Sequence, residues 1–242
     1  MRKWLCLMLL LGWSGAAAEW RPLKTGLDYR TADLGEVRMH QFRLDPQKVQ
    51  LEVFVASDYG RPAMFVGELA EAAQATVMVN GGYFDAEQKP MGYLKDGQVI
   101  VSDVHPGSAF GGILLVGRGK PTVVSRDTFR PGPERLALQC GPRLIDRGQA
   151  VGGIHEAGPR ARTGVSIDSQ GLLYLYACDS RPGLTFAQLQ KILRKPLSGG
   201  GLAARYALNL DGGTSTQMVL RHPKLKAAIP AFVAVPVGLG VR

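Results

Sequence analysis

The sequence has few of the residues that hold metals or carry thiol chemistry. Among its 242 residues are three cysteines and four histidines. Neither set has the close spacing of a zinc site, a redox pair or another metal-ligand cluster. We therefore expect no metal and no cofactor, and we expect the histidines to be structural or exposed. The histidines are His40, His105, His155 and His222.

Long apolar segments are also missing beyond the first residues. No later stretch reaches the roughly 18 uninterrupted apolar residues that a membrane-spanning helix needs. Residues 1–18 combine a basic start, an apolar run over 5–13 and the small residues 16–18. This order is typical of a secretory signal peptide. We therefore expect a periplasmic or secreted protein, with a mature chain of residues 19–242 that has no transmembrane segment.

Linkers, repeats and low-complexity tracts are absent too, so residues 19–242 are predicted to form a single domain. The chain is basic, with a formal net charge of +9. Its basic residues are scattered and are not interleaved with aromatic residues, so nucleic acid is not an expected partner. The charge instead suits anionic small molecules or glycans, such as phosphate esters.

Short strand-like segments, punctuated by glycine and proline, are abundant. The expected strands are residues 36–44, 50–57, 76–80, 98–102, 113–116, 122–124, 136–138, 164–168, 172–177, 207–210, 217–220 and 232–237. Helical patterns are few. They cover residues 63–73, residues 201–206, and a third segment that begins with a capping box of Thr185 and Gln188 and runs to about Leu193. We predict an α+β fold, a single domain of mixed, largely antiparallel sheets with two or three short helices.

Two glycine pairs follow strand-like segments and carry polar residues. Residues 79–85 read VNGGYFD, and residues 209–217 read NLDGGTSTQ. Each pair alone is typical of a β-hairpin turn, because glycine supplies the positive φ that tight turns need. The alternative is a pocket in which Asn80 and Asp211 face a ligand and the glycine amides approach anionic oxygen. The dipeptides themselves fit both interpretations.

Arginines and cysteines lie near the predicted strand ends between these motifs. Arg143 and Arg162 are set among glycine, proline and small residues. Most arginines belong to a solvated surface, but a planar guanidinium in such a position could hold phosphate with two hydrogen bonds. Cys140 and Cys178 would be free to pair in an exported protein. A disulfide and two buried thiols both remain open.

Six segments in their order along the chain resemble the phosphodiester glycosidase family. They are NGGYFD at 80–85, PMG at 90–92, GPRLI at 141–145, ARTGVSID at 161–168, DSRPG at 179–183 and LNLDGGTSTQM at 208–218. Together they span most of the mature chain. The resemblance implies an exported hydrolase that cleaves the glycosidic bond of a sugar-1-phosphodiester, with a sugar phosphodiester or a phosphorylated glycan as substrate.

The resemblance also implies which residues form the site. Asp211 and Asp179 are the expected carboxylates, and Arg162 is the expected catalytic arginine. The expected substrate-binding residues are Asn80, Gly81, Gly82, Tyr83, Asp85, Arg143, Arg181, Asn209, Gly212, Gly213, Thr214, Ser215 and Thr216. Thr214 stands where the family pattern has a third glycine, so its φ should be negative or the loop should differ, because threonine at positive φ is strained.

These residue types fit glycosyl transfer to water. Such reactions pass through an oxocarbenium-like state and normally use two carboxyl groups, while arginine can stabilise the charge of a departing phosphate.

Fold-level resemblance does not fix function, and three other functions stay open. They are a non-catalytic module that binds phosphorylated cell-envelope glycans, a purely structural envelope protein, and a metal-assisted phosphodiesterase, for which the sequence offers no histidine-rich ligand set.

Overall fold

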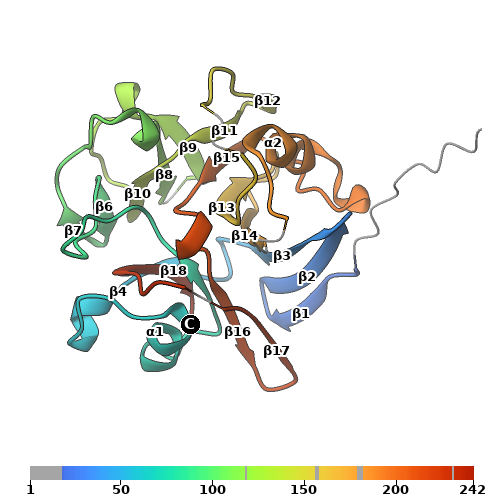
Figure 1. Ribbon diagram of the computed structural model, residues 1–242, viewed down its shortest axis with the longest axis horizontal. Coiled ribbons are helices and arrows are strands. Elements are labelled where there is room, and N and C mark those ends of the chain that lie inside the picture. Colours follow the sequence, from blue (N-terminus) through green and yellow to red (C-terminus); the bar gives the residue numbers. More distant parts are fainter. Residues whose placement is uncertain (1–17, 118, 156–157, 179–181, 231) are drawn as a thin grey trace, which may run out of the picture.

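The chain folds mainly into antiparallel β-sheets, as a computed structural model shows for residues 18–117, 119–155, 158–178, 182–230 and 232–242. These residues form three sheets and two α-helices (Figure 1). Every pairing between the named strands is antiparallel. The predicted α+β class with largely antiparallel sheets is confirmed. Neither helix in this part of the chain is long and apolar enough to span a membrane.

The largest sheet, here called the large sheet, has eight strands. Their order is β1 (Arg21–Lys24), β2 (Leu27–Leu34), β3 (Val37–Leu44), β14 (Leu173–Cys178), β13 (Arg162–Ile167), β15 (Tyr206–Asn209), β11 (Arg143–Asp146) and β12 (Gln149–Ala150). Strands that are far apart in the sequence therefore lie next to one another in the middle of this sheet, where β3 pairs with β14.

Two five-stranded sheets complete the fold. The β10 sheet has the order β7 (Gln98–Val101), β6 (Leu94–Asp96), β10 (Leu136–Cys140), β8 (Gly112–Val116) and β9 (Thr122–Ser125). The β5 sheet has the order β17 (Leu225–Ile229), β16 (Met218–His222), β5 (Val77–Asn80), β18 (Val237–Val241) and β4 (Glu52–Val55). In Figure 1 the β10 sheet lies above the β5 sheet on the left, and the large sheet occupies the right side.

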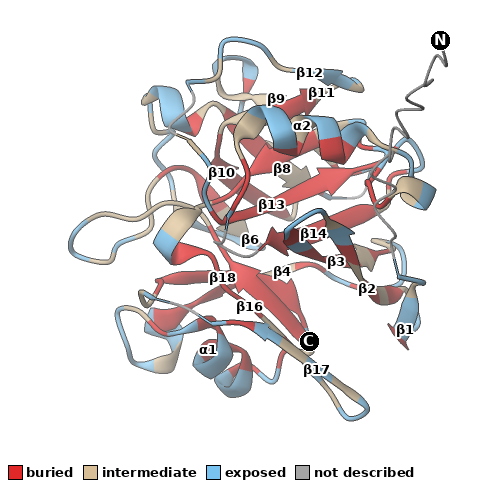
Figure 2. Ribbon diagram, turned by 45° about the vertical axis from the view of Figure 1, so that its right-hand side comes forward, coloured by how far each residue is buried: buried red, intermediate tan, exposed pale blue. Residues whose placement is uncertain are grey.

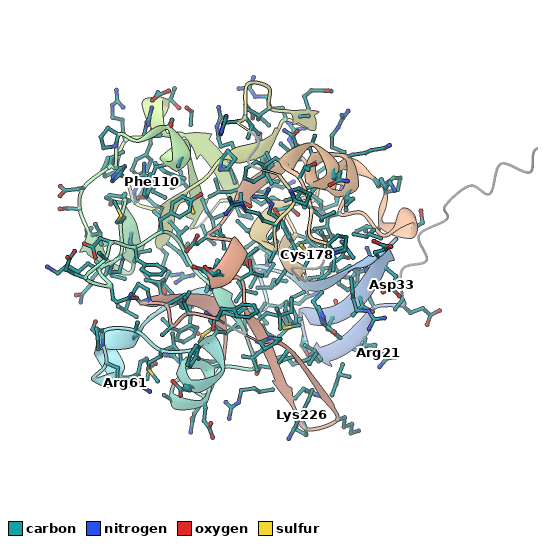
Figure 3. All side chains as sticks on the ribbon, in the orientation of Figure 1. Arg21, Asp33, Arg61, Phe110, Cys178 and Lys226 are labelled. Carbon is teal, nitrogen blue, oxygen red and sulfur yellow. The ribbon has the colours of Figure 1, made fainter. Side chains whose placement is uncertain are left out.

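All three sheets contribute to one central apolar cluster. It contains Phe42 from the large sheet, Leu138 from the β10 sheet and Val79 from the β5 sheet, each at most 1% exposed. Figure 2 shows these central strands as buried, with exposed residues along the loops and the outer sides of the helices. Figure 3 labels charged side chains at the rim and Cys178 nearer the middle. Because the core is shared, the sheets hold one another in place at their meeting point.

The two helices cover the outer faces of different sheets. Helix α2 (Phe186–Arg194) buries Leu189 and Leu193 against the large sheet. Its predicted capping box is confirmed: the Gln188 N–H donates to Thr185 Oγ1 at 3.1 Å, and the Thr185 N–H donates to Gln188 Oε1 at 2.9 Å. Helix α1 (Val66–Ala72) packs Leu69 against the β5 sheet. Short 3-10 turns also occur at residues 56–59, 108–110, 126–128, 197–199 and 213–215.

The structure corrects three sequence-based expectations. Residues 201–205 form an irregular segment instead of a third helix, because the N–H groups of Ala203 and Ala204 donate to the carbonyls of Lys195 and Leu193. The last strand, β18, begins at Val237, five residues after the predicted start at 232. Six strands were not predicted: β1, β2, β6, β11, β12 and β17.

Candidate active site

The candidate site lies where the three sheets meet. Strand β5 ends at Asn80, β10 ends at Cys140, β13 begins at Arg162 and β15 ends at Asn209. The loop after β15 joins the sheets, because the Leu210 N–H donates to Thr163 O at 2.9 Å and the Asp211 N–H donates to Gly81 O at 3.2 Å. The orange-red turn after β15 is visible at the centre of Figure 1. The two glycine motifs therefore come together, as the pocket interpretation requires.

Asn80 connects the strands behind this loop. Its Nδ2 donates to Asp211 O at 2.8 Å, and its Oδ1 accepts from Thr163 Oγ1 at 2.7 Å and from the Gln217 N–H at 3.2 Å. The residue is fully buried, with 0% exposure. The expected direct contact of Asn80 with substrate is therefore replaced by a positioning role, since its carboxamide exposes no atom to a ligand.

Asp211 presents a half-buried carboxyl group in the second motif. Burial raises the pKa of this group, while hydrogen bonds from the Ser215 hydroxyl and from the Gly212 N–H oppose the rise. The Gly212 N–H lies 2.8 Å from Asp211 Oδ1. A carboxyl group whose pKa lies above its ordinary value, and whose backbone is fixed from behind, is suited to exchanging protons.

The glycines serve packing and backbone conformation more than anion binding. The N–H groups of Gly81, Gly212 and Gly213 donate to Val237 O, Asp211 Oδ1 and Ala161 O. These three amides are therefore occupied by protein groups, which leaves the expected cradle without three of its four glycine amides. A Cβ on Gly81 would lie 2.6 Å from a methyl carbon of Val237.

The turn after Gly212 explains the threonine that departs from the family pattern. Gly213 has a φ of +62° and begins a 3-10 turn that runs to Ser215. Thr214 lies inside this turn and is not among the residues with positive φ. The strain that a threonine would suffer in the left-handed region therefore does not arise. Thr216 follows, and its Oγ1 is buried without a hydrogen-bond partner in the described chain.

Tyr83 and Asn209 meet at one backbone carbonyl. The Tyr83 hydroxyl donates to Gly141 O at 2.6 Å, and Asn209 Nδ2 donates to the same oxygen at 3.0 Å. Burial raises the pKa of Tyr83, so the phenol stays protonated and acts as a donor. Asn209 Oδ1 is buried and has no hydrogen-bond partner among the described residues. Tyr83 and Asn209 therefore fix the 141–143 loop beside the site.

Arg162 is held at the start of β13. It is 4% exposed, and its Nε donates to Leu184 O at 2.8 Å. Its guanidinium carbon lies 3.7 Å from the centroid of the Phe186 ring. Asp179 and Arg181, expected as a second carboxylate and a second cation, lie outside the described residues, as does Ser180. Strand β14 ends just before them at Cys178, which is directly opposite Arg162 in the sheet.

A cavity of about 500 Å³ adjoins these residues. Tyr83, Arg143 and Phe186 line it, and they link it to the Asp211 loop and to Arg162. Arg143 also pairs with Asp146 at 3.1 Å. His155 lines the same cavity, although no sequence pattern singled it out. Phe186 was missed as well, and only its position at the first turn of α2 could have indicated it.

Two further predicted features have local explanations. Asp85 accepts from the Lys89 N–H at 2.8 Å and so stabilises the turn over 85–89, with no hydrogen bond to the Asp211 loop. Cys140 and Cys178 are separate buried thiols, so the disulfide alternative does not hold in this structure. Among the described residues, no group of three or more histidines, cysteines, aspartates and glutamates could hold a metal ion.

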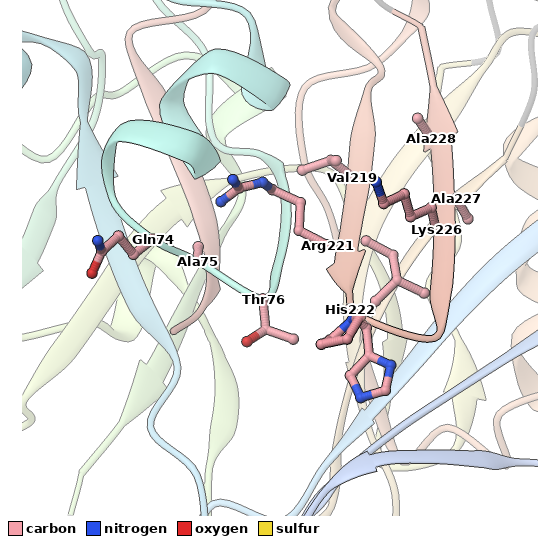
Figure 4. Close-up of a pocket in the computed structure, with 11 residues that line it drawn as sticks. Gln74, Ala75, Thr76, Val219, Arg221, His222, Lys226, Ala227 and Ala228 are labelled. Atoms are coloured by element: carbon pink, nitrogen blue, oxygen red, sulfur yellow. The ribbon is translucent and has the colours of Figure 1, made fainter.

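A larger cavity lies elsewhere and has different chemistry. It has a volume of about 850 Å³ and lies beside β16 and β17 (Figure 4). No aspartate or glutamate lines it. Cleavage of a glycosidic bond needs carboxyl groups. Asp211 does not itself line the smaller cavity, but Tyr83, which lines it, lies close enough to Asp211 for the two groups to interact. The smaller cavity is therefore the better candidate for an active site.

Comparison with known proteins identifies the family and the fold. The sequence matches the phosphodiester glycosidase family over residues 73–242. The fold is similar to that of the catalytic domain of zebrafish N-acetylglucosamine-1-phosphodiester alpha-N-acetylglucosaminidase, in a form auto-inhibited by its pro-peptide. The TM-score is 0.64 at 20% identity, covering 89% of this chain and 81% of that one.

A second solved structure, of a hypothetical protein from Synechocystis, has a TM-score of 0.57 at 17% identity, covering 90% of this chain and 62% of that one. No curated protein matches the sequence. At these identities the structural likeness concerns the fold alone. The family match, however, extends over more than half of the chain and includes Asn80, Arg162 and Asp211. The chain therefore belongs to the phosphodiester glycosidase family.

Proposed function

We propose that the protein hydrolyses the glycosidic bond of a sugar-1-phosphodiester and releases a free sugar and a phosphate monoester. The observation that carries the proposal is the half-buried Asp211 carboxyl group, whose pKa is raised and whose backbone Asn80 holds at the junction of three sheets. Membership of the phosphodiester glycosidase family supports the same reaction class.

In the proposed reaction, the bond between the anomeric carbon and the phosphate oxygen breaks, and that oxygen leaves with the phosphate. Water supplies the new oxygen on the sugar. Glycosidases normally divide this chemistry between two carboxyl groups. We assign proton transfer to Asp211, because a raised pKa suits a group that changes protonation during the reaction. Asp179 is the proposed second carboxylate.

Arginine would stabilise the phosphate. A phosphate monoester needs little help from a proton donor as it leaves, so positive charge near its oxygens lowers the barrier most directly. Arg143 lines the 500 Å³ cavity, and Arg162 lies behind Phe186, which lines it too. We assign phosphate binding to these two side chains, with Arg181 as a proposed third contributor. The sugar would contact Tyr83 and the exposed Thr214, whereas the Thr216 hydroxyl is buried and would act from behind them.

The proposal includes export and a single catalytic unit. The basic start, apolar run and small residues of segment 1–18 support a secretory signal peptide. The apolar cluster shared by all three sheets supports one folding unit over residues 19–242. The protein would then act in the periplasm or outside the cell, on a sugar phosphodiester or a phosphorylated glycan of the envelope.

The test is product identification on defined substrates. Purified protein is incubated with UDP-N-acetylglucosamine and a panel of para-nitrophenyl sugar phosphodiesters, and products are identified by mass spectrometry. The expected products are free sugar and an intact phosphate monoester, and Asp211→Asn should abolish them. Asp33→Asn is the matched control, because Asp33 is an exposed partner of Arg38 in the salt bridge at 2.8 Å.

The alternatives give other results. A binding module for phosphorylated glycans would bind members of the panel without turnover, and Asp211→Asn would leave that binding largely intact. A phosphodiesterase would release a sugar phosphate instead of free sugar. Either result would contradict the proposed reaction.

A further inference from the structure

The outer face of the β16–β17 hairpin is only partly covered. Helix α1 packs over the centre of the β5 sheet, where Leu69 meets Met78. Strand β17 forms the edge of that sheet, beyond β16. On this edge Lys226 and Ala228 are exposed, while the alternate residue Ile229 is buried on the core side. An uncovered strip of sheet therefore runs alongside α1.

This strip is hollowed into two cavities that share a floor. The first, of about 850 Å³, is the cavity shown in Figure 4. The second has a volume of about 260 Å³ and extends toward the start of α1. Val219 and Ala228 line both cavities. The two hollows together are called here the α1 groove.

One end of the α1 groove is cationic. Arg221 on β16 and Lys226 on β17 are directly opposite each other in the sheet. Like charges in that position destabilise a strand pair. Arg221 is anchored by a hydrogen bond of 2.9 Å to Ala70 O, and its nearest carboxylate, the exposed Glu71, is 4.0 Å away. Lys226 forms no salt bridge with any described residue. None of the residues that line the larger cavity is acidic. An anion placed here would relieve the repulsion.

The other end of the α1 groove is apolar. Phe65 and Pro230 line the smaller cavity together with Val219 and Ala228 of its floor, and Phe65 is 42% exposed. The one polar side chain that lines the smaller cavity, Gln217, already forms hydrogen bonds within the protein. Gln217 Oε1 accepts from the Val66 N–H at 2.7 Å, and its Nε2 donates to Val233 O at 3.1 Å. The face of the sheet at this end offers a bound peptide no free side-chain partner for its amides, which is costly, whereas an acyl chain has no such groups.

We propose that the α1 groove binds a single-chain anionic amphiphile. The anionic head lies between Arg221 and Lys226, and the acyl chain runs over Val219 and Ala228 toward Phe65. Lys226 and Pro230 are separated by four residue steps of an extended strand, or about 13 Å, so the floor suits a chain of medium length. This site is distinct from the Asp211 site and does not depend on the proposed hydrolysis.

The test measures binding of dodecyl phosphate to the full-length protein by calorimetry, below the micelle concentration. We expect saturable binding at a single site, weakened about tenfold or more by Ala228→Trp, which fills the floor, and about fivefold by Lys226→Glu. Dodecyl maltoside, which has the same chain and no charge, should bind about tenfold more weakly.

Two controls separate the groove from general effects. Lys224→Glu makes the same charge change in the hairpin turn, outside the lining, and Ala187→Trp adds the same bulk on the exposed side of α2. Both should change the affinity less than about twofold. Absence of binding, or equal binding by Ala228→Trp, would overturn the proposal. Binding to phosphatidylglycerol vesicles without binding to the monomeric amphiphile would also overturn it and indicate a membrane surface instead.

Discussion

The two glycine motifs look alike in the sequence but have different roles in the structure. Asn80, in the first motif, is fully buried and bonded to three protein groups. Asp211, in the second, is half-buried and has a raised pKa. The first motif therefore forms a frame, and the second holds a reactive group on that frame. A polar residue followed by two glycines at a strand end is compatible with either role, and burial of the polar atoms distinguishes them.

The largest expected effect follows from removing the reactive group alone. Asp211→Asn keeps an oxygen that can accept from the Gly212 N–H, but it cannot exchange a proton. We expect kcat to fall by about 10²- to 10⁴-fold, with a smaller change in KM. Steady-state kinetics on an active substrate from the panel would measure this. A fall in kcat of less than tenfold would show that Asp211 is not the proton-transfer group.

Removing the buried side chain of the first motif should instead lower the stability of the folded protein. Asn80→Ala leaves Asp211 O, Thr163 Oγ1 and the Gln217 N–H without their buried partner. Because each buried group left unsatisfied costs about 1 to 3 kcal/mol, we expect the free energy of unfolding to fall by roughly 3 kcal/mol or more. Urea denaturation gives this quantity. Thr163→Val, which removes only one of the bonds, should cost less; equal losses would contradict the frame role.

The glycines offer a finer comparison between the motifs. Gly81→Ala places a Cβ 2.6 Å from Val237, so overpacking should lower the free energy of unfolding by about 1 to 3 kcal/mol. Gly213→Ala meets only the Arg160 guanidinium at 4.0 Å, but its φ of +62° should cost about 1 to 2 kcal/mol.

Asparagine provides the control for this pair, because it tolerates the left-handed region better than alanine. Gly213→Asn should be more stable than Gly213→Ala, and Gly81→Asn should be no better than Gly81→Ala. The opposite ranking at either position would show that the wrong cause had been assigned to that glycine. Thermal unfolding of the four variants would decide.

The smallest expected effect concerns stability and pH. The folded-state pKa of Asp211 is raised, so the native state binds more protons than the unfolded state between the unfolded and folded pKa values. The contribution of this group to stability is therefore lost as pH rises through that window. Asp211→Asn should raise Tm by roughly 1 to 4 °C at neutral pH, and by less below the ordinary aspartate pKa of about 3.9. An increase that is the same at both pH values would contradict this account.

How much could be predicted from the sequence depended on whether a residue's partners are local. The capping box of Thr185 and Gln188 needs only residues three apart, and it was predicted correctly. The role of Asn80 depends on Thr163 and Gln217, which are 83 and 137 positions away, so no local pattern could reveal it.

Strand β2 was missed for the same reason. Its sequence, LDYRTADL, has charged residues that interrupt the apolar alternation. Yet Arg30 is only 4% exposed, because it donates to Gln41 and to the carbonyls of Leu197 and Gly201. Two of those acceptors, the carbonyls of Leu197 and Gly201, are 167 and 171 positions away in the sequence. Charged residues inside a strand can therefore be buried when the tertiary structure supplies their partners.

The central claim is that the reaction breaks the bond between the sugar carbon and the phosphate oxygen. The most direct measurement is hydrolysis of a sugar-1-phosphodiester in water labelled with heavy oxygen, with mass spectrometry of both products before the anomeric oxygen exchanges. We predict that the label enters the free sugar and that the phosphate monoester contains none. Label in the phosphate would show attack at phosphorus and would contradict the assignment of a glycosidase.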